Sequence, residues 1–333
     1  MISLNDFLKS VSINIDSYIK EKLVGEPPDF YESSLYILKA GGKRLRPALV
    51  FASGYAFGGS EKYLLPFAAG VELLHNFTLI HDDIMDNDDY RRGVPTVHKL
   101  WGIPTAILAG DLLFSYSLYL PLHSCDDFEI KDRCIKASKK LAWASLTVAE
   151  GQALDMSFEK KESVSEEEYM NMIEKKTAAL IESSAYIGAT IGGADEKDLM
   201  HISEFGRKIG IAFQIVDDIL GIFGKEEETG KPVYSDIREG KKTLLIIRAL
   251  ALSNKEERNK LISILGKKGL GKEEYAVAAR IIEELGVLEY ANIKARNLAE
   301  EAKSHLDEIK GSTNKEYISL LKDIADLVVR RKK

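Results

Sequence analysis

Cysteine and proline are both scarce in this chain. Of its 333 residues only two are cysteine, Cys125 and Cys134, and their spacing fits neither a CxxC pair nor a zinc site. This scarcity excludes a disulfide-rich secreted fold, and a reducing compartment fits. The eight prolines leave the interval from Leu122 to Lys231 empty. Because proline interrupts helices more strongly than any other residue, this interval can hold several long helices.

The chain also lacks an excess of basic charge and an apolar N-terminus. Its net charge is −6, which argues against a general polyanion binder, so we expect no nucleic-acid partner. Asp6 and Lys9 interrupt the N-terminal residues, so we predict no signal peptide, no stable membrane insertion and a cytoplasmic location. Any phosphate that such an acidic protein binds must be held by local basic clusters.

Hydrophobic periodicity predicts an all-α fold. From Ile135 to Met156 apolar residues recur at three- and four-residue steps, and no comparable segment alternates with a period of two. The same spacing predicts helices over residues 64–85, 106–120, 169–191 and 199–223 and over most of the chain after residue 242. The breaks are short and none resembles a linker, so we expect one domain over residues 1–333, a bundle of long helices around a central cavity. We assign Met85, Trp101 and Trp143 to the core.

The first chemical signal is an acidic set at the end of an apolar segment, LLHNFTLIHDDIMD. Asp82, Asp83 and Asp86 fall within an arc of about 100° on one helix face. Three carboxylates this close repel one another unless cations lie between them, and carboxylate oxygens suit Mg²⁺, which commonly shares a substrate phosphate. His75 lies near the same stripe and could reach a diphosphate, whereas His81 is offset and is expected in the core. A solvated acidic helix end is the alternative.

A second aspartate pair, Asp217 and Asp218, lies in the apolar segment FQIVDDILG. Gln214 and Gly221, at i−3 and i+4 from Asp217, border its face. Charges on an apolar helix have little structural purpose. Two such segments therefore suggest two acidic sets that face one another across a cavity holding a metal diphosphate.

Basic residues accompany both acidic sets. The segment GGKRLRP places a glycine turn before a helix that we predict to begin at Pro47, an arrangement able to bind anionic oxygens. Arg91 and Arg92 can offer planar guanidinium groups to a diphosphate. Each segment alone is weak evidence, but together they supply the cations that two metal-bridged diphosphates need. The remaining basic candidates are Lys43, Arg44, Arg46, Lys175, Lys176, Lys231, Lys241 and Lys242.

In order along the chain, GGKRLRP, LLHNFTLIHDDIMD, RRG, KKT, FQIVDD, GKP and SDIREGKKT resemble the motifs of trans-isoprenyl diphosphate synthases, most closely those of archaeal geranylgeranyl diphosphate synthases. The resemblance spans residues 39–243. It implies a Mg²⁺-dependent prenyltransferase of the isoprenoid synthase fold, which condenses isopentenyl diphosphate with dimethylallyl, geranyl or farnesyl diphosphate and makes mainly the C20 product. It also implies a homodimer or a dimer-based oligomer.

The resemblance further implies a role for individual residues. Isopentenyl diphosphate would bind to Lys43, Arg46, His75 and Arg92. The allylic diphosphate would bind to Arg91, Lys176, Thr177, Gln214, Lys231 and Lys241. The carbocation would be steadied by the carbonyl region of Lys176 and Thr177 and by the Gln214 amide. Mg²⁺ would be held by Asp82, Asp86 and Asp217, with Asp83 and Asp218 assisting. Gly221 stands where many members carry a third aspartate, which puts a role for that position in doubt.

Phe77, five residues before Asp82, is the predicted floor of the product channel. It lies roughly 7.5 Å down the helix axis but about 140° around it, so its ring must lean into the channel or the channel must curve. Archaeal-type geranylgeranyl synthases carry an aromatic residue here, and the small Thr78 beside it leaves room for more than a C15 chain. The resemblance thus implies C20, and an ordinary core phenylalanine is the alternative.

Other functions share part of this pattern. A farnesyl synthase or a synthase of C25 and longer products would carry the same motifs. A class I terpene cyclase would share the fold and the first acidic set, but its second metal site mixes Asn or Asp, Ser or Thr, and Glu at a wider spacing. An HD-type phosphohydrolase needs more histidine ligands than six scattered ones provide. A noncatalytic subunit would be expected to have lost its acidic motifs, and this chain keeps both.

Overall fold

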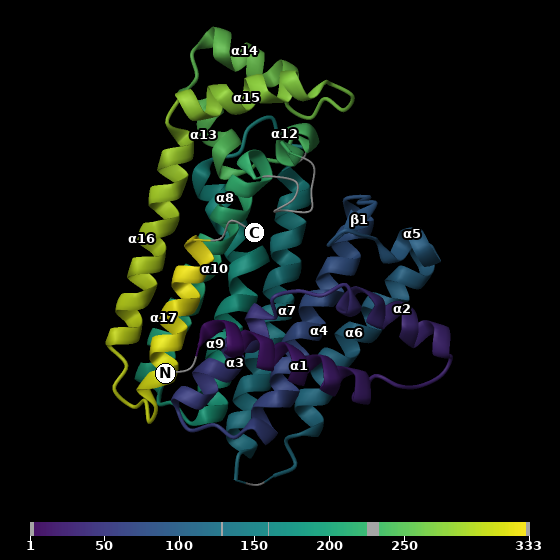
Figure 1. The fold of residues 1–333 in the computed structure, drawn as a ribbon, viewed down its shortest axis with the longest axis vertical. Coiled ribbons are helices and arrows are strands. Elements are labelled where there is room, and N and C mark those ends of the chain that lie inside the picture. The colour runs from purple at the N-terminus through teal and green to yellow at the C-terminus, as the bar shows by residue number, and fades with distance from the viewer. Residues whose placement is uncertain (1–2, 128, 159, 225–232, 331–333) are drawn as a thin grey trace. The chain divides into compact units, whose positions relative to one another are not determined.

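The computed structural model describes residues 3–127, 129–158, 160–224 and 233–330 (Figure 1). Almost all of its regular structure is helical, which confirms the all-α prediction. The exception among these residues is a hairpin in which β1 (Tyr90–Arg91) pairs antiparallel with β2 (Val94–Pro95). Strands of two residues are too short to show a periodic pattern, so the sequence did not reveal them.

The predicted helices agree with the observed ones within a few residues. The helix start predicted at Pro47 is wrong, since α3 begins at Leu45. Pro47 is its third residue, where the missing N–H costs no intrahelical hydrogen bond. In chain order the helices are α1 (Leu4–Lys22), α2 (Pro28–Lys39), α3 (Leu45–Ala56), α4 (Glu61–Met85), α5 (Val97–Trp101), α6 (Ile103–His123), α7 (Lys131–Phe158), α8 (Glu166–Ile173), the π-helical turn η1 (Glu174–Ala178), α9 (Ala179–Gly192), α10 (Glu196–Phe223), α12 (Ser235–Glu239), α13 (Leu244–Leu252), α14 (Lys255–Ile264), α15 (Lys272–Glu284), α16 (Val287–Asp307) and α17 (Lys315–Val329).

The contacts within the chain define two compact units. Unit 1 comprises Met1–Leu146, Leu180–Gly206 and His305–Ile324, and it contains the first acidic set and the GGKRLRP segment. Unit 2 comprises Thr147–Ala179, Arg207–Ser304 and Ala325–Lys333, and it contains the second acidic set, the KKT segment and α12. A single domain over the whole chain stays a prediction.

In unit 1 the helix that carries the first acidic set is a core element. Leu73 and Leu74 of α4 are fully buried, and α2, α3 and α6 pack on this helix (Figure 1). Two glycines allow α6 to come close to it. A Cβ on Gly70 would lie 2.5 Å from the Ser117 carbonyl oxygen, and one on Gly110 would lie 2.3 Å from His81 Nε2. This close packing fixes the position of the α4 C-terminus, where the aspartates lie.

Two of the described helices, α4 and α6, are long and apolar enough to cross a membrane by length and composition alone. In α4, 67% of the most apolar window is buried inside the protein, as in the core helix of a globular fold. In α6 only 33% is buried, and Ile103, Ile107 and Leu108 are among its exposed side chains. Neither of these two helices lies among the described N-terminal residues. The burial of α4 therefore supports the expectation of no membrane insertion. The exposed apolar side chains of α6 leave that expectation untested for this helix.

The structure corrects three smaller expectations. Cys125 and Cys134 form a disulfide, with Cα atoms 5.6 Å apart, because the turn between α6 and α7 brings them together. Cysteine usage therefore gives no support for a reducing compartment. Met85 and Trp143, assigned to the core, are 44% and 41% exposed. The Lys140 ammonium lies over the Trp143 ring, 3.7 Å from its centroid, so the indole is covered by an aliphatic stem and a cation rather than by the core.

Candidate active site

The three aspartates at the end of α4 differ in their exposure. Asp83 is buried, whereas Asp86 is exposed and the Asp82 side chain is 20% exposed. Asp82 and Asp86 lie one helical turn apart, so their carboxylates lie on neighbouring turns of one face. They are therefore the two members of the predicted set that can bind a ligand from solution.

Arg91 from the β1 strand pairs with this acidic set. Its Nε donates to Asp83 Oδ1, and its Nη2 lies 3.5 Å from Asp82 Oδ2 and 3.7 Å from Asp88 Oδ2. Burial raises the pKa of Asp83 to about 6, although the Arg91 charge opposes that rise. Asp83 Oδ2 finds no hydrogen-bond partner in the part of the chain that the structure describes. Asp83 thus holds Arg91 next to Asp82, and a diphosphate bound there would meet the guanidinium.

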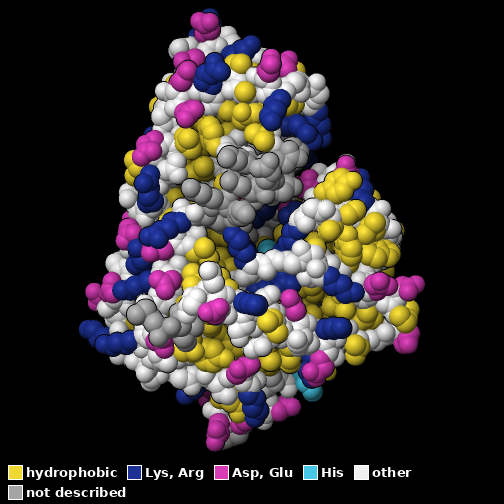
Figure 2. All heavy atoms as spheres, in the orientation of Figure 1, with side chains coloured by type: hydrophobic (Ala, Val, Ile, Leu, Met, Phe, Trp, Pro, Cys, Tyr) yellow, Lys and Arg dark blue, Asp and Glu magenta, His cyan; other side chains and the backbone are white. Residues whose placement is uncertain are grey.

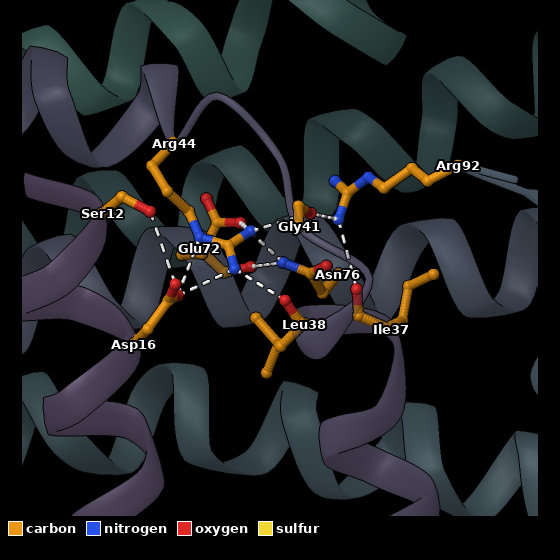
Figure 3. Close-up of polar contacts among 9 residues, drawn as sticks. All are labelled: Ser12, Asp16, Ile37, Leu38, Gly41, Arg44, Glu72, Asn76 and Arg92. Atoms are coloured by element: carbon orange, nitrogen blue, oxygen red, sulfur yellow. Dashed lines mark hydrogen bonds and ion pairs between the residues drawn. The ribbon is translucent and has the colours of Figure 1, made fainter. Parts of the chain in front are cut away.

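The GGKRLRP segment is held by a buried arginine that the prediction left without a role. Arg44 has left-handed backbone torsion angles, with φ at 46°, and its buried guanidinium points toward Asp16 and Glu72 (Figure 3). Its Nε and Nη2 donate to Asp16 Oδ1 over 2.9 and 2.8 Å, and its Nη1 donates to Glu72 Oε1 over 3.0 Å. Asn76 Nδ2 also donates to Glu72 Oε1, over 2.8 Å. The loop that precedes α3 is therefore tied to α1 and α4 by charge-assisted hydrogen bonds.

Arg92 holds the other side of the same loop. Its Nη1 donates to the carbonyl oxygens of Gly41 and, over 3.2 Å, Ile37. Gly42, with φ at 146°, lies between the two arginines: a Cβ there would lie 3.0 Å from Arg44 Nη1 and 3.1 Å from Arg92 Nη2. Only glycine fits this backbone. The prediction that Arg92 binds diphosphate directly is untested, and its present contacts are with the loop.

His75 lies among the arginines of this region. Burial holds the pKa of His75 well below its ordinary value, and the charges of Arg46 and Arg92 lower it further. The ring is therefore neutral at physiological pH and offers one N–H donor and one acceptor. Lys43 is exposed and Arg46 is partly buried. Several cationic groups around a neutral histidine suit a phosphate ligand.

This arginine network gives a stability prediction. Replacing Arg44 by alanine leaves the Glu72 carboxylate, which is 3% exposed, without its charged partner, so we expect a loss on the order of 3–5 kcal/mol in the free energy of unfolding. Asp16→Asn is the matched control, because the Asp16 side chain is 48% exposed and water can replace the lost charge. Urea unfolding measures both. A smaller loss for Arg44→Ala than for Asp16→Asn would contradict a role for this buried pair.

In unit 2 the two aspartates of the second set have different environments. Asp217 is exposed, whereas Asp218 is buried. Asp218 accepts from the Tyr169 hydroxyl, from Gln214 Nε2 over 2.9 Å and from the Leu244 backbone N–H over 3.4 Å. Burial, with the neighbouring Asp236 charge, raises the pKa of Asp218 to about 7. Asp217 is therefore the residue of this pair that can hold a cation. Asp218 instead links α10 to α8 and to the start of α13 through its hydrogen bonds.

Gln214 and Thr177, two of the predicted site residues, form a hydrogen bond with each other. Thr177 Oγ1 donates to Gln214 Oε1 over 2.7 Å, while the Gln214 amide nitrogen donates to Asp218. These two hydrogen bonds fix the direction of the Gln214 amide. One lone pair of its oxygen is left for a cationic substrate.

The KKT segment forms the π-helical turn η1, where a regular helix was predicted. A Cβ on Gly151 would lie 2.2 Å from the Lys176 backbone nitrogen, so α7 can only pass this turn at a glycine. Such turns occur frequently at functional sites. Lys176 Nζ contacts Asp155 Oδ2 at 2.6 Å, and Lys241 Nζ lies 3.2 Å from Glu239 Oε2. Lys231 lies outside the described residues.

Phe77 packs against two aromatic rings. Its ring centroid lies 5.1 Å from that of Phe114 on α6 and 4.7 Å from that of His81. The His81 ring contacts the Ile107 carbonyl oxygen at 3.1 Å and is partly exposed rather than part of the core. Phe114 thus forms a second aromatic layer that sequence reasoning did not identify.

The residues fit Mg²⁺. The accessible donors, Asp82 and Asp86 in unit 1 and Asp217 in unit 2, are carboxylates, the hard oxygen ligands that this ion prefers. Among the described residues no group of three or more His, Cys, Asp and Glu side chains makes a complete metal site. Such partial protein ligation suits Mg²⁺, which keeps waters and shares substrate phosphates.

Comparison with known proteins gives concordant results. A model of the polyprenyl synthetase family matches residues 27–284. The geranylgeranyl diphosphate synthase of Sulfolobus acidocaldarius is 44% identical, over 99% of this chain and 98% of the relative. The geranylfarnesyl diphosphate synthase of Aeropyrum pernix is 41% identical over 93% and 97%. A crystal structure of geranylgeranyl pyrophosphate synthetase from Pyrococcus horikoshii superposes with a TM-score of 0.90 at 37% identity, covering 98% of this chain and 99% of that one.

Proposed function

The chain belongs to the polyprenyl synthetase family, and from this premise we propose that it is a Mg²⁺-dependent enzyme that condenses isopentenyl diphosphate with C5 to C15 allylic diphosphates and makes mainly geranylgeranyl diphosphate. The observation that carries the proposal is the pairing of the accessible Asp82 with Arg91 at the end of a buried helix. A metal-bound diphosphate needs both groups, an anion for the metal and a cation for its own oxygens.

The reaction follows from these charges. Asp82, Asp86 and Asp217 would hold Mg²⁺, which when bound neutralises the charge that grows on the leaving diphosphate. Arg91 donates to the same oxygens. The allylic C–O bond breaks, the isopentenyl double bond forms the new C–C bond, and the proton lost from the adduct passes to the released diphosphate. Gln214, whose amide is fixed by Thr177 and Asp218, directs its oxygen toward the cation.

Product analysis tests this function. The purified chain is incubated with Mg²⁺, isopentenyl diphosphate and, separately, the C5, C10 and C15 primers, and the product length is measured. A main product of C20 supports the proposal, and the C25 product named for the Aeropyrum pernix relative is the alternative that this measurement separates. A cyclic hydrocarbon made from geranylgeranyl diphosphate alone would identify a terpene cyclase. No turnover by the pure chain would indicate a noncatalytic subunit.

The two substrate sites can be separated by kinetics. We expect Arg46→Ala to raise the KM for isopentenyl diphosphate and Lys231→Ala to raise the KM for the allylic substrate, each by at least about 10-fold, because one charge-assisted contact is lost. Lys39→Ala removes an exposed cation close in sequence to Arg46 and is the control. If each variant raised the KM of the other substrate, the assignment of the two sites would be reversed.

We propose that the chain is a homodimer or a dimer-based oligomer in the cytoplasm. The exposed apolar residues of α6 support the oligomer, because contact with a second copy of the chain would remove these side chains from water. Charged side chains of both signs are scattered over the face shown in Figure 2. Light scattering of the purified chain measures the mass directly.

A further inference from the structure

Four polar side chains of unit 2 form a continuous chain of hydrogen bonds. The Tyr169 hydroxyl on α8 donates to Asp218 Oδ2 on α10, and Gln214 Nε2 donates to Asp218 Oδ1 over 2.9 Å. At the other end, Thr177 Oγ1 on η1 donates to Gln214 Oε1 over 2.7 Å. The chain therefore begins and ends on the continuous segment of α8 and η1, and its two central members lie one turn apart on α10.

Tyr169 contributes a polar group at a place that is otherwise core. Its side chain is among the largest that are fully buried in the described part of the protein. Burial raises the pKa of its hydroxyl well above the ordinary value, so the phenol keeps its proton and donates. A phenylalanine would fill the same space without requiring a hydrogen-bond partner. The use of tyrosine here is therefore explained by what the hydroxyl does to Asp218.

The Tyr169 hydroxyl restricts the rotation of the Asp218 carboxylate. Oδ2 accepts from Tyr169 and, over the longer distance of 3.4 Å, from the Leu244 N–H. With Oδ2 held in this direction, Oδ1 is the oxygen that faces Gln214. An ionised carboxylate only accepts hydrogen bonds, so Gln214 turns its NH₂ group toward Asp218 and its oxygen toward Thr177. The direction of the amide thus depends on the tyrosine.

We propose that Tyr169 is a positioning residue for the condensation, which acts through Asp218 to hold the Gln214 amide with its oxygen directed at the allylic cation. The inference rests on the proposed function, since it takes Gln214 as the group that steadies this cation. A dipole that is aligned before the reaction stabilises the developing charge without having to reorient. Tyr169 needs no contact with either substrate for this role.

Single-turnover kinetics test the role. Tyr169→Phe keeps the ring and leaves Asp218 its other two donors, so we expect it to fold. The rate of condensation should fall on the order of 10-fold, while the KM for both substrates stays within about twofold, because the direction of the amide matters only as the cation forms. Tyr290→Phe is the matched control. It removes another tyrosine hydroxyl of unit 2, 2.6 Å from Glu166 Oε1, and should leave the rate unchanged.

A double-mutant cycle separates positioning from a general effect on the fold. Gln214→Met removes the amide, so in this background Tyr169→Phe should lower the rate by less than about twofold, because the two residues act as one unit. An equal loss with and without the amide would show that Tyr169 supports the fold alone, and it would overturn the proposal.

The amide can also be observed without turnover. The chain has two glutamines, Gln152 and Gln214, so ¹⁵N-glutamine labelling gives two side-chain amide signals in a nuclear magnetic resonance spectrum. Gln214→Met identifies the signal of Gln214. Tyr169→Phe should shift this signal, and Tyr290→Phe should not. An unshifted Gln214 signal in Tyr169→Phe would overturn the proposal, as would an undiminished rate in a preparation whose wild type condenses both substrates.

Two further outcomes are distinguished by the same spectrum. If Tyr169→Phe does not fold, Asp218→Asn tests the link: with its oxygen held by the Tyr169 hydroxyl, its NH₂ group faces Gln214, and the Gln214 signal must shift. An unshifted signal there contradicts the proposal. A shifted signal in Tyr169→Phe, together with no condensation by the wild type, would support the positioning of the amide and place the failure with the proposed function.

Discussion

Replacing Asp82 or Asp217 by alanine is expected to lower kcat on the order of 10³-fold. Both carboxylates are accessible at helix surfaces: Asp82 is one of the two accessible members of the first acidic set, with Asp86, and Asp217 is the accessible member of the second. Removing a metal ligand removes charge stabilisation that grows as the allylic C–O bond breaks, so the loss appears in kcat as well as in kcat/KM. The fold should survive, because neither side chain fills the core.

The neighbouring aspartates provide the controls for this experiment. Asp89→Asn removes an exposed charge whose partner is Lys99, 2.7 Å away, and it should leave kcat unchanged. Asp83→Ala should instead lower the thermal midpoint, since Asp83 is buried against Arg91. Steady-state kinetics and thermal melts distinguish these effects. Near-normal turnover in Asp82→Ala or Asp217→Ala would refute the metal assignment.

The parts of the site that the sequence revealed are those encoded by local spacing. Asp82, Asp83 and Asp86 share a helix face at fixed angles, and Gln214 lies one turn from Asp218, so the pattern itself places them together. The all-α fold was equally accessible, because apolar periodicity is a property of each segment alone. The spacing did not predict which aspartates of each acidic set are buried and which are exposed.

The parts that the sequence concealed depend on contacts between distant segments. Asp16 of α1 accepts hydrogen bonds from Arg44, and Tyr169 of α8 donates one to Asp218. The Asp236 carboxylate of α12 lies next to Gly221. No spacing rule relates these positions. A charged Glu72 within the apolar run of α4 was the one available signal, because a buried acid requires a partner. Gly221 was recognised as a departure, but only the structure shows which side chain lies beside it.

Product length gives the other large effect. Replacing Phe77 by alanine is expected to shift the main product beyond C20. A prenyl chain anchored by its diphosphate at the aspartates must grow back along α4, and Phe77 lies roughly 7.5 Å down that axis from Asp82. Its ring lies over α6, 5.1 Å from Phe114, so the two rings together can close the channel although Phe77 lies on another side of the helix from Asp82.

The layers beneath Phe77 set the expected new limit. Leu74, about 4.5 Å further along the axis, is fully buried and is the next bulky side chain on α4. A leucine side chain is smaller than a phenylalanine ring and would limit the chain less strictly, so the products should become longer and more heterogeneous. Phe114→Ala should give a partial extension, because the ring of Phe77 then loses its support but remains in place.

Phe51→Ala provides the control for volume. Phe51 lies in the core of the same unit, on α3, and its removal also creates a cavity, at a cost of about 3–5 kcal/mol in stability. It should leave product length unchanged, since Phe51 lies on α3, whereas the predicted channel follows α4. The product distributions of the three variants are compared by chromatography after incubation with farnesyl diphosphate and excess isopentenyl diphosphate. If Phe77→Ala keeps the wild-type distribution, or if Phe51→Ala lengthens the product as much, the floor lies elsewhere and the C20 assignment loses its physical basis.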